Sequence, residues 1–187
     1  VPDADLFRAI AKKKGSVVTD RIETFTPAGI KLKSGAELEA DIVVMATGLV
    51  LQPFGGARFV VDGKPVEPPK TLIYKGMMYS DVPNLASVFG YTNASWTLKA
   101  DLVCEYVCRL LNHMDRKGFR QATPRNSDPT LTEEPWVNFS SGYIQRALEH
   151  QPKQGSKRPW KLYQNYVLDL LTLRHGSVKD KAMVFTK

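Results

Sequence analysis

The stretch GYTNASWTLKADLVCEYVCRLLNHMDRKG, residues 90–118, carries the clearest secondary-structure signal in the chain. Its apolar residues recur at steps of three and four, which is the period of one face of an α-helix. They are Leu98, Leu102, Tyr106, Val107, Leu110, Leu111 and Met114. Basic residues precede Gly118, as is common where a helix ends. We therefore predict a helix over residues 95–117, with Asn93 or Ser95 as its N-cap.

A short apolar run, residues 85–89, leads into Gly90 and this helix, and we expect it to be a strand. A second run, residues 42–45 (IVVM), lacks polar alternation, so we expect a strand covered on both faces that stops at Ala46-Thr47-Gly48. In open α/β sheets, ligands lie beyond the carboxyl ends of strands, where glycine permits close approach. Helix N-termini also attract anions. The two strand ends therefore predict two sides of one cofactor crevice.

The rest of the chain reads as short elements joined by turns. We expect strands or hairpins over residues 16–19, 21–26, 29–33, 38–45, 58–61 and 64–66. We expect helices over residues 3–11, 141–150 and 160–175, and a loop over residues 120–138. Alternating short strands and amphipathic helices indicate the α/β class.

Composition and charge limit the kinds of protein that fit. The chain has 187 residues, of which 43% are hydrophobic and 24% charged, as in soluble globular proteins. It has no run of 18 apolar residues and no secretory leader, so we expect a cytoplasmic protein, and because Val1 is not a methionine we expect more chain upstream. Of the net charge of +7, residues 151–187 carry +6. One interpretation of this basic tail is peripheral contact with an anionic membrane or with nucleic acid. The alternative is a solvated basic edge that packs against a body not present in this chain.

Cysteines and histidines suggest no separate chemistry. Cys104 and Cys108 lie four residues apart on one predicted helix, which is too few ligands for a metal site or a disulfide framework, so we predict two buried helix residues. For His113, His150 and His175 we identify no convergent acid or nucleophile in the sequence. We therefore predict no metal site and assign no catalytic residue.

Several motifs carry a resemblance to a known family. Asp41 and the segment Ala46-Thr47-Gly48 resemble the ATG segment of flavoprotein monooxygenases of class B. More specific are residues 75–78 (KGMM), 82–85 (VPNL), 90–102 (GYTNASWTLKADL), 152–156 (PKQGS), 159–160 (PW) and 164–166 (QNY). Together these motifs resemble the Baeyer–Villiger subgroup, over essentially all of residues 1–187, in alignment with the C-terminal portion of that family.

The resemblance implies a fold and a set of cofactor-binding residues. It implies the C-terminal part of a two-dinucleotide-binding (Rossmann-like) FAD/NAD(P)-binding fold that ends in helices. Residues 1–45 would end the NADPH-binding domain, residues 46–119 would belong to the FAD-binding domain, and residues 120–187 would be a connector and a helical basic extension. The implied FAD neighbours are Ala46, Thr47, Gly48, Gly90, Tyr91, Asn93, Trp96 and Thr97. From the residues alone, Tyr91 and Trp96 fit core packing as well, and Asn93 fits a plain helix cap.

The same resemblance implies a reaction. FAD reduced by NADPH would capture O₂ as a C4a-peroxyflavin and insert one oxygen atom beside a ketone, or onto the sulfur of a thioether or thioamide. No G-x-G-x-x-G loop occurs in the chain, and neither Arg8, Arg21 nor Arg58 matches the context of the family's catalytic arginine. We therefore expect the chain to depend on the upstream part of the same polypeptide and to be inactive alone. The alternatives are a truncated non-catalytic partner and a basic binding module.

Overall fold

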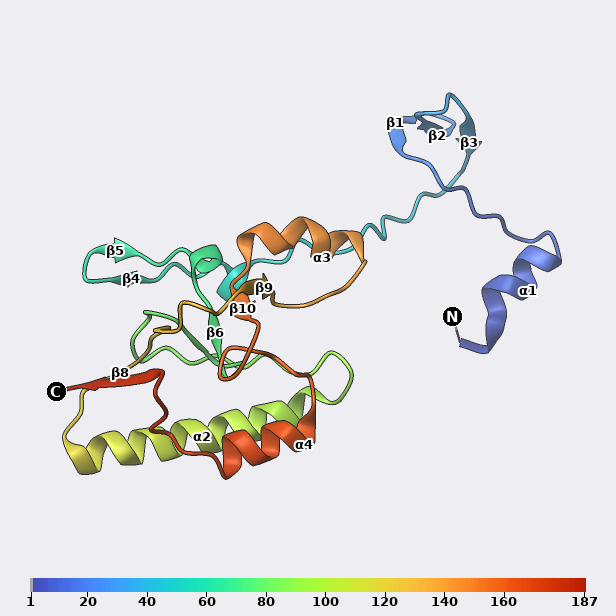
Figure 1. Cartoon of the computed structure of the whole chain (residues 1–187). Coiled ribbons are helices and arrows are strands. Elements are labelled where there is room, and N and C mark those ends of the chain that lie inside the picture. Colours follow the sequence, from blue (N-terminus) through green and yellow to red (C-terminus); the bar gives the residue numbers. More distant parts are fainter. Residues whose placement is uncertain (1) are drawn as a thin grey trace. The chain divides into compact units, whose positions relative to one another are not determined.

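The computed structural model describes residues 2–187, which form two units, one up to Thr47 and one from Gly48 onward. The first unit begins with the short turn η1 (Pro2–Ala4) and the helix α1 (Asp5–Ala11), which agrees with the predicted N-terminal helix. It continues with three antiparallel strands in the order β1 (Ile22–Thr26), β2 (Gly29–Leu32), β3 (Glu37–Glu39) (Figure 1). The strands at residues 21–26 and 29–33 are confirmed, whereas residues 16–19 form no strand.

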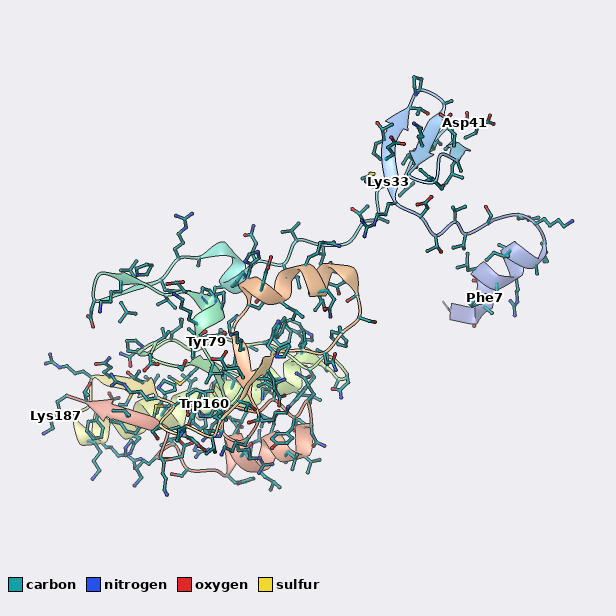
Figure 2. The ribbon with its side chains drawn as sticks, turned by 45° about the horizontal axis from the view of Figure 1, so that its top comes forward. Phe7, Lys33, Asp41, Tyr79, Trp160 and Lys187 are labelled. Atoms are coloured by element: carbon teal, nitrogen blue, oxygen red, sulfur yellow. The ribbon has the colours of Figure 1, made fainter. Side chains whose placement is uncertain are left out.

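The first unit buries few side chains. No residue of α1 is buried, and Phe7 is 65% exposed on its surface (Figure 2). In the sheet, Gly29 and Leu32 are buried. A Cβ atom on Gly29 would lie 2.0 Å from the Leu38 carbonyl oxygen, so the close approach of β2 and β3 requires glycine there.

The predicted buried strand at residues 42–45 is wrong. Residues 42–52 have no helix or strand, and the side chains of Ile42 and Val44 are 81% and 82% exposed. A strand needs a neighbour to satisfy its backbone groups, and within residues 2–187 nothing pairs with this segment. Apolar composition alone did not bury it.

The second unit is organised around the helix α2 (Trp96–Lys117), as the sequence predicts. The side chains of Leu102, Val103, Tyr106, Leu110 and Met114 are buried on one face of α2. Alongside α2 lie α4 (Tyr166–Asp169) and its continuation as a π-helix, η5 (Leu170–Arg174) (Figure 1). The guanidinium of Arg109 on α2 donates hydrogen bonds to the carbonyls of Leu173, Arg174 and Gly176, which satisfies the end of that helix.

Four two-stranded antiparallel sheets complete the second unit. The pairs are β4 (Val60–Val61) with β5 (Lys64–Pro65), β6 (Ile73–Tyr74) with β7 (Met78–Tyr79), β8 (Gln121–Pro124) with β11 (Met183–Thr186), and β9 (Glu133–Pro135) with β10 (Lys153–Gly155). Between them lie the short helix α3 (Gly142–Ala147) and the turns η2 (Pro53–Gly56), η3 (Pro68–Lys70) and η4 (Leu148–His150). The structure thus contains helices and several small sheets.

Of the other sequence predictions for this unit, two agree with the structure, two do not, and one helix begins later than predicted. The hairpin predicted at residues 58–66 corresponds to β4 and β5, and the helix predicted at residues 141–150 to α3 and η4. The predicted loop over residues 120–138 contains β8 and β9, and the predicted strand at residues 85–89 has only a single bridge, from Met78 to Ala86. The last helix begins at Tyr166, not at residue 160, because Asn165 caps it by accepting a hydrogen bond from the Leu168 amide at 3.1 Å.

The VPNL motif has a structural role in this unit. Asn84 pairs with β8 as a strand residue would, since its amide donates to the Ala122 carbonyl at 3.0 Å. Its side chain adds two bonds: Nδ2 donates to the Arg120 carbonyl at 3.0 Å, and Oδ1 accepts from the Ala122 amide at 2.9 Å. Asn84 has a positive φ of 56°, a conformation that asparagine tolerates better than most residues. The motif thereby fixes β8 against the segment that follows β7.

Candidate functional site

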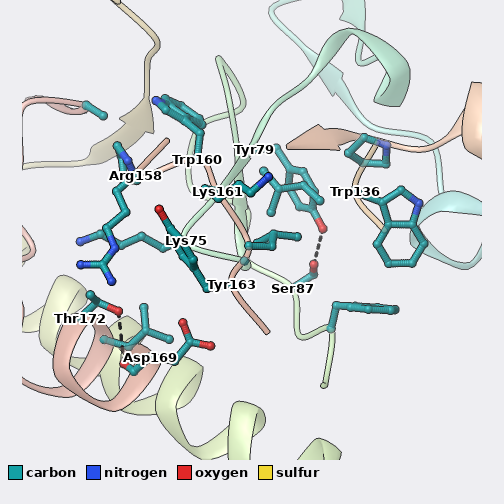
Figure 3. Close-up of a pocket in the computed structure, with 18 of the residues that line it drawn as sticks. Lys75, Tyr79, Ser87, Trp136, Arg158, Trp160, Lys161, Tyr163, Asp169 and Thr172 are labelled. Carbon is teal, nitrogen blue, oxygen red and sulfur yellow. Dashed lines mark hydrogen bonds between the residues drawn. The ribbon is translucent and has the colours of Figure 1, made fainter. Parts of the chain in front are cut away.

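The second unit contains a cavity of about 980 Å³, a volume typical of sites for small molecules and cofactors. Its wall includes residues from the β6–β7 turn, from residues 87–91, from residues 158–164 and from α4 and η5 (Figure 3). Gly90 and Tyr91, two of the predicted cofactor neighbours, are among the lining residues. The cavity therefore brings together motifs that are about 70 residues apart in the sequence.

The loop that precedes α2 is held in place by Gln164. The side-chain Oε1 of Gln164 accepts hydrogen bonds from the Thr92 amide at 3.0 Å and from the Thr92 hydroxyl at 3.2 Å. The Asn93 side chain donates to the Gln164 carbonyl at 3.1 Å. Asn93 is therefore engaged with Gln164, and Ser95 is the N-cap residue of α2, although without a side-chain capping bond. The GYTNASW and QNY motifs are therefore in direct contact, through hydrogen bonds of Thr92 and Asn93 with Gln164.

A buried ion pair lies beneath this loop. The ammonium of Lys99 is 2.8 Å from Asp169 Oδ2, and its side chain is only 7% exposed. The Tyr91 hydroxyl donates to the same Asp169 oxygen at 2.8 Å. Burial and, secondarily, the neighbouring Asp169 carboxylate raise the pKa of Tyr91 above its ordinary value, so the hydroxyl stays protonated and remains a donor. Tyr91 therefore both lines the cavity and ties α2 to α4.

A second polar cluster lies at the β6–β7 turn. Lys75 is 2.9 Å from Asp180 Oδ2 and 3.3 Å from the Tyr106 hydroxyl. The fully buried Tyr74 donates its hydroxyl to Asp180 at 2.6 Å, and burial raises the pKa of Tyr74 well above its ordinary value. This cluster anchors the C-terminal segment to the core.

Sequence reasoning missed both of these clusters. Asp169 and Asp180 are the only acids in the basic tail, residues 151–187, and each pairs with a lysine whose side chain is at most 11% exposed. Isolated acids in a basic segment were therefore an available signal. The lysine partners gave a weaker signal, since Lys99 lies on the mainly apolar face of α2.

Three of the other predicted cofactor neighbours, Asn93, Trp96 and Thr97, are exposed around the start of α2 and do not line the cavity. Ala46, Thr47 and Gly48 are exposed residues at the boundary between the two units. Trp96 packs against Phe89, with ring centroids 5.1 Å apart. A Cβ atom on Gly90 would lie 2.2 Å from Trp96 Cγ, so the indole rests directly on the Gly90 backbone. The structure thus brings Gly90, Tyr91 and Trp96 together and gives Gly90 a steric reason to be glycine.

The two cysteines are exposed, which contradicts the prediction that they are buried. The reason is helical phase: α2 turns Leu102, Val103 and Tyr106 to the core, so Cys104 and Cys108 face outward. Within residues 2–187 no three histidine, cysteine or acidic side chains gather as metal ligands. In the same part of the chain, every helix is too short or too polar to cross a membrane.

Much of the basic tail is paired with acids elsewhere in the second unit. Lys153 contacts Glu133 at 2.5 Å, Lys157 contacts Asp128 at 2.7 Å, and Lys161 contacts Glu134. Arg174 makes a two-point contact with Glu105. The hydrogen bond from Lys157, with further bonds from Thr130, lowers the pKa of Asp128 to about 2. These pairs place an acid from the same unit beside four of the eight basic residues of the tail.

Comparison with known proteins identifies relatives along the whole chain. The FAD-containing monooxygenase EthA of Mycobacterium tuberculosis is 53% identical over 187 residues, all of this chain. AlmA of Acinetobacter baylyi, which carries the name of an FAD-binding monooxygenase, is 47% identical over 188 residues, and MymA of Mycobacterium tuberculosis, named as an FAD-containing monooxygenase, is 47% identical over 186. No protein-family model and no solved structure matches significantly.

The chain spans 38% of the length of each of these relatives. Identity near one half, sustained over every part of the chain, is too high and too extended for a shared fold alone. The resemblance to flavoprotein monooxygenases is therefore confirmed: the chain is homologous over its whole length to FAD-containing monooxygenases.

Proposed function

We propose that the chain forms part of an FAD- and NADPH-dependent monooxygenase that inserts one oxygen atom of O₂ into ketones, or adds it to the sulfur of thioethers or thioamides. The observation that carries this proposal is the 53% identity to an FAD-containing monooxygenase over all 187 residues. In this proposal the chain is the C-terminal part of a Rossmann-like two-dinucleotide fold. The glycine-rich dinucleotide loops then come from a preceding part of the same polypeptide.

The start of α2 supports a flavin site beside Gly90 and Tyr91. The helix has 22 residues, and its N-cap Ser95 makes no side-chain bond to the first-turn amides. Those amides and the helix dipole favour an electron-rich group, such as the pyrimidine edge of the flavin. When bound, FAD supplies the redox and oxygen chemistry. The residues of this chain fit the group because a long helix start with amides free of side-chain caps directly follows the cavity wall.

The surrounding residues position that helix start. Gln164 holds Thr92 and Asn93, and the Lys99–Asp169 pair holds Tyr91, so the loop between Gly90 and α2 is tied to the C-terminal segment at several points. Phe89, Trp136 and Trp160 line the cavity with large apolar rings. Such a wall excludes water, which strengthens electrostatic interactions with a bound group. Rigid positioning and exclusion of water are the contributions that this chain makes.

The experiment is to purify the full-length protein and measure bound flavin together with NADPH oxidation in the presence of ketones and thioethers. We expect a stoichiometric flavin spectrum and oxidation of NADPH that increases with substrate, whereas residues 1–187 alone should retain no stoichiometric flavin. Absence of flavin from the full-length protein, or NADPH oxidation indifferent to every substrate, would contradict the proposal.

One substitution tests the role of the loop. Gln164→Ala removes the acceptor of Thr92, a loss on the order of 1–2 kcal/mol, and should weaken flavin retention roughly tenfold. Gln145→Ala is the matched control, because Gln145 is exposed on α3 and does not line the cavity. Flavin dissociation constants measured by fluorescence compare the two variants. Equal flavin affinity in both variants would show that the loop held by Gln164 does not contribute to flavin binding.

A further inference from the structure

The charges around the cavity are unbalanced. Six basic residues line it, namely Lys75, Lys99, Arg125, Arg158, Lys161 and Lys181, against the three acids Asp128, Asp169 and Asp180. Each of the three carboxylates already has a lysine partner within 2.9 Å. The cavity therefore offers no free carboxylate to a cationic ligand and has positive charge in excess.

Arg158 carries the part of that excess that is best placed to bind a ligand. Among the residues that the structure describes, neither Arg158 nor Lys181 has an acidic partner. The Arg158 guanidinium lies over the Tyr163 ring, 5.1 Å from its centroid, and Figure 3 shows the two side chains together on one side of the cavity. Within residues 2–187, the Arg158 guanidinium donates no hydrogen bond to another residue, so its N–H edge is free. That edge matches a carboxylate in a two-point contact.

The opposite side of the cavity is apolar and aromatic. Phe54 packs edge-on against Tyr79 with centroids 4.7 Å apart, and Phe89 packs edge-on against Trp136 at 4.5 Å. All four rings line the cavity, and Figure 3 shows Tyr79 and Trp136 on the side away from Arg158. The hydroxyl of Tyr79 is hydrogen-bonded to Ser87, so this polar atom is satisfied. The cavity is thus amphipathic, with a cation at one side and rings at the other.

We propose that this cavity binds amphiphilic anions, with the ligand's carboxylate on Arg158 and its apolar chain against Phe54, Phe89 and Trp136. The assignment deepens the proposed function, on which it rests, by naming the substrate class: a ketone or thioether that carries an apolar chain and a carboxylate. Arg158 is a binding residue here, and it takes no part in the oxidation itself.

Equilibrium binding to the full-length protein tests the proposal without relying on turnover. The probes are 11-(dansylamino)undecanoic acid and its methyl ester, followed by the rise in dansyl fluorescence. One charge-assisted two-point contact corresponds to about a tenfold difference in affinity. We expect the acid to bind about tenfold more tightly than the ester. In Arg158→Gln that ratio should fall to about one.

Arg146→Gln is the matched control, because Arg146 is exposed in the same unit and does not line the cavity. It should keep the tenfold ratio. The use of a ratio protects the test from a general loss of folded protein, which would lower both affinities together. A ratio unchanged in Arg158→Gln, or lowered equally in Arg146→Gln, would overturn the proposal. Competitive displacement of the acid by NADP⁺ would also overturn it, since Arg158 would then belong to a nucleotide phosphate site.

Turnover separates this inference from the proposed function. The substrates are a long-chain keto acid and its methyl ester, with NADPH oxidation as the readout. If the acid is preferred by kcat/KM, both proposals stand. If acid and ester are oxidised equally well, the function stands and the substrate class fails. If neither is oxidised although the binding ratio holds, the monooxygenase proposal fails for this substrate class and the anion site remains.

Discussion

Two segments of this chain, residues 42–45 and residues 73–79, differ in burial in the opposite sense to their polarity. Residues 42–45 (IVVM) are wholly apolar, yet their side chains are between 39% and 82% exposed. Residues 73–79 (IYKGMMY) include a lysine and two tyrosines, yet Tyr74, Met77 and Met78 are at most 1% exposed. The more polar segment is therefore the buried one.

Hydrogen-bond partners explain the difference. The segment 73–79 pairs with itself through β6 and β7, and its flanking residues close the turn, since the Ser80 amide donates to the Leu72 carbonyl at 2.9 Å and the Ser80 hydroxyl accepts from the Leu72 amide at 2.9 Å. Tyr74 and Lys75 both contact Asp180. Burial is favourable only where polar groups keep partners, and this segment has them. Residues 42–45 pair with no strand in the part of the chain that the structure describes.

The largest expected effect on stability comes from a comparison of a buried leucine with an exposed one. Leu102 is fully buried on α2, whereas Leu49 is 65% exposed. Leu102→Ala should lower the free energy of unfolding by about 3–5 kcal/mol, through lost burial and a residual cavity. Leu49→Ala should change it by less than about 0.5 kcal/mol. Urea titration of residues 1–187 measures both values. A large loss in Leu49→Ala would show that the segment is covered in solution, and would break the contrast.

A smaller effect is expected from the buried ion pair. Asp169→Ala leaves the ammonium of Lys99 buried without its carboxylate and deprives the Tyr91 hydroxyl of its acceptor. The expected loss is about 3 kcal/mol, at the low end for a broken buried pair because the Asp169 side chain is 17% exposed. Glu67→Ala, which breaks the exposed pair with Lys70, should cost no more than about 0.5 kcal/mol. Chemical denaturation compares the two variants, and similar losses would refute a special role for the buried pair.

The sequence predicted the elements whose signal is local. The helix over residues 96–117 follows from the spacing of its apolar residues, and the β4–β5 hairpin follows from Asp62-Gly63. Gly90 was expected at a crevice because a strand end and a small residue precede a helix start, whereas Tyr91 was implied only by the family resemblance. For the elements predicted from the pattern, the deciding interactions lie within about one or two helical turns, so the sequence contains them.

The elements that were missed depend on distant partners. The strand β8 reads QATP, with almost no apolar pattern, and it forms because β11 pairs with it about 60 residues later. Likewise, nothing near Gln164 in sequence indicates that its side chain binds Thr92. The reverse error at residues 42–45 has the same origin: the pattern was that of a strand, but a pattern supplies no pairing partner. Long-range pairing is the information that a single sequence lacks.

The smallest expected effect concerns a buried group whose neighbours are unfavourable to its charge. His113 is buried on α2, where its ring packs against Phe185 at 5.1 Å and against Phe119 at 6.0 Å. Burial and the nearby charges of Lys179, Arg116 and Lys117 lower the pKa of His113 below its ordinary value of 6.5. Below pH 6.5 the unfolded chain therefore binds a proton that the folded chain resists. Stability that is fully present above pH 6.5 should decline as the pH falls toward the folded-state pKa.

His113→Phe removes this titration and should flatten the dependence of unfolding free energy on pH between 7.5 and 5.5. His150→Phe is the control for the exchange of histidine for phenylalanine, because the His150 side chain is 68% exposed. Urea midpoints measured at several pH values for the three proteins give the slopes. The test sharpens the contrast with residues 73–79, where Lys75 has a carboxylate partner, whereas the charges that act on His113 are those of Lys179, Arg116 and Lys117. If His113→Phe and the unaltered protein show the same slope, the imidazole of His113 reaches solvent. The packing around His113 would then exclude water less well than the β6–β7 core does.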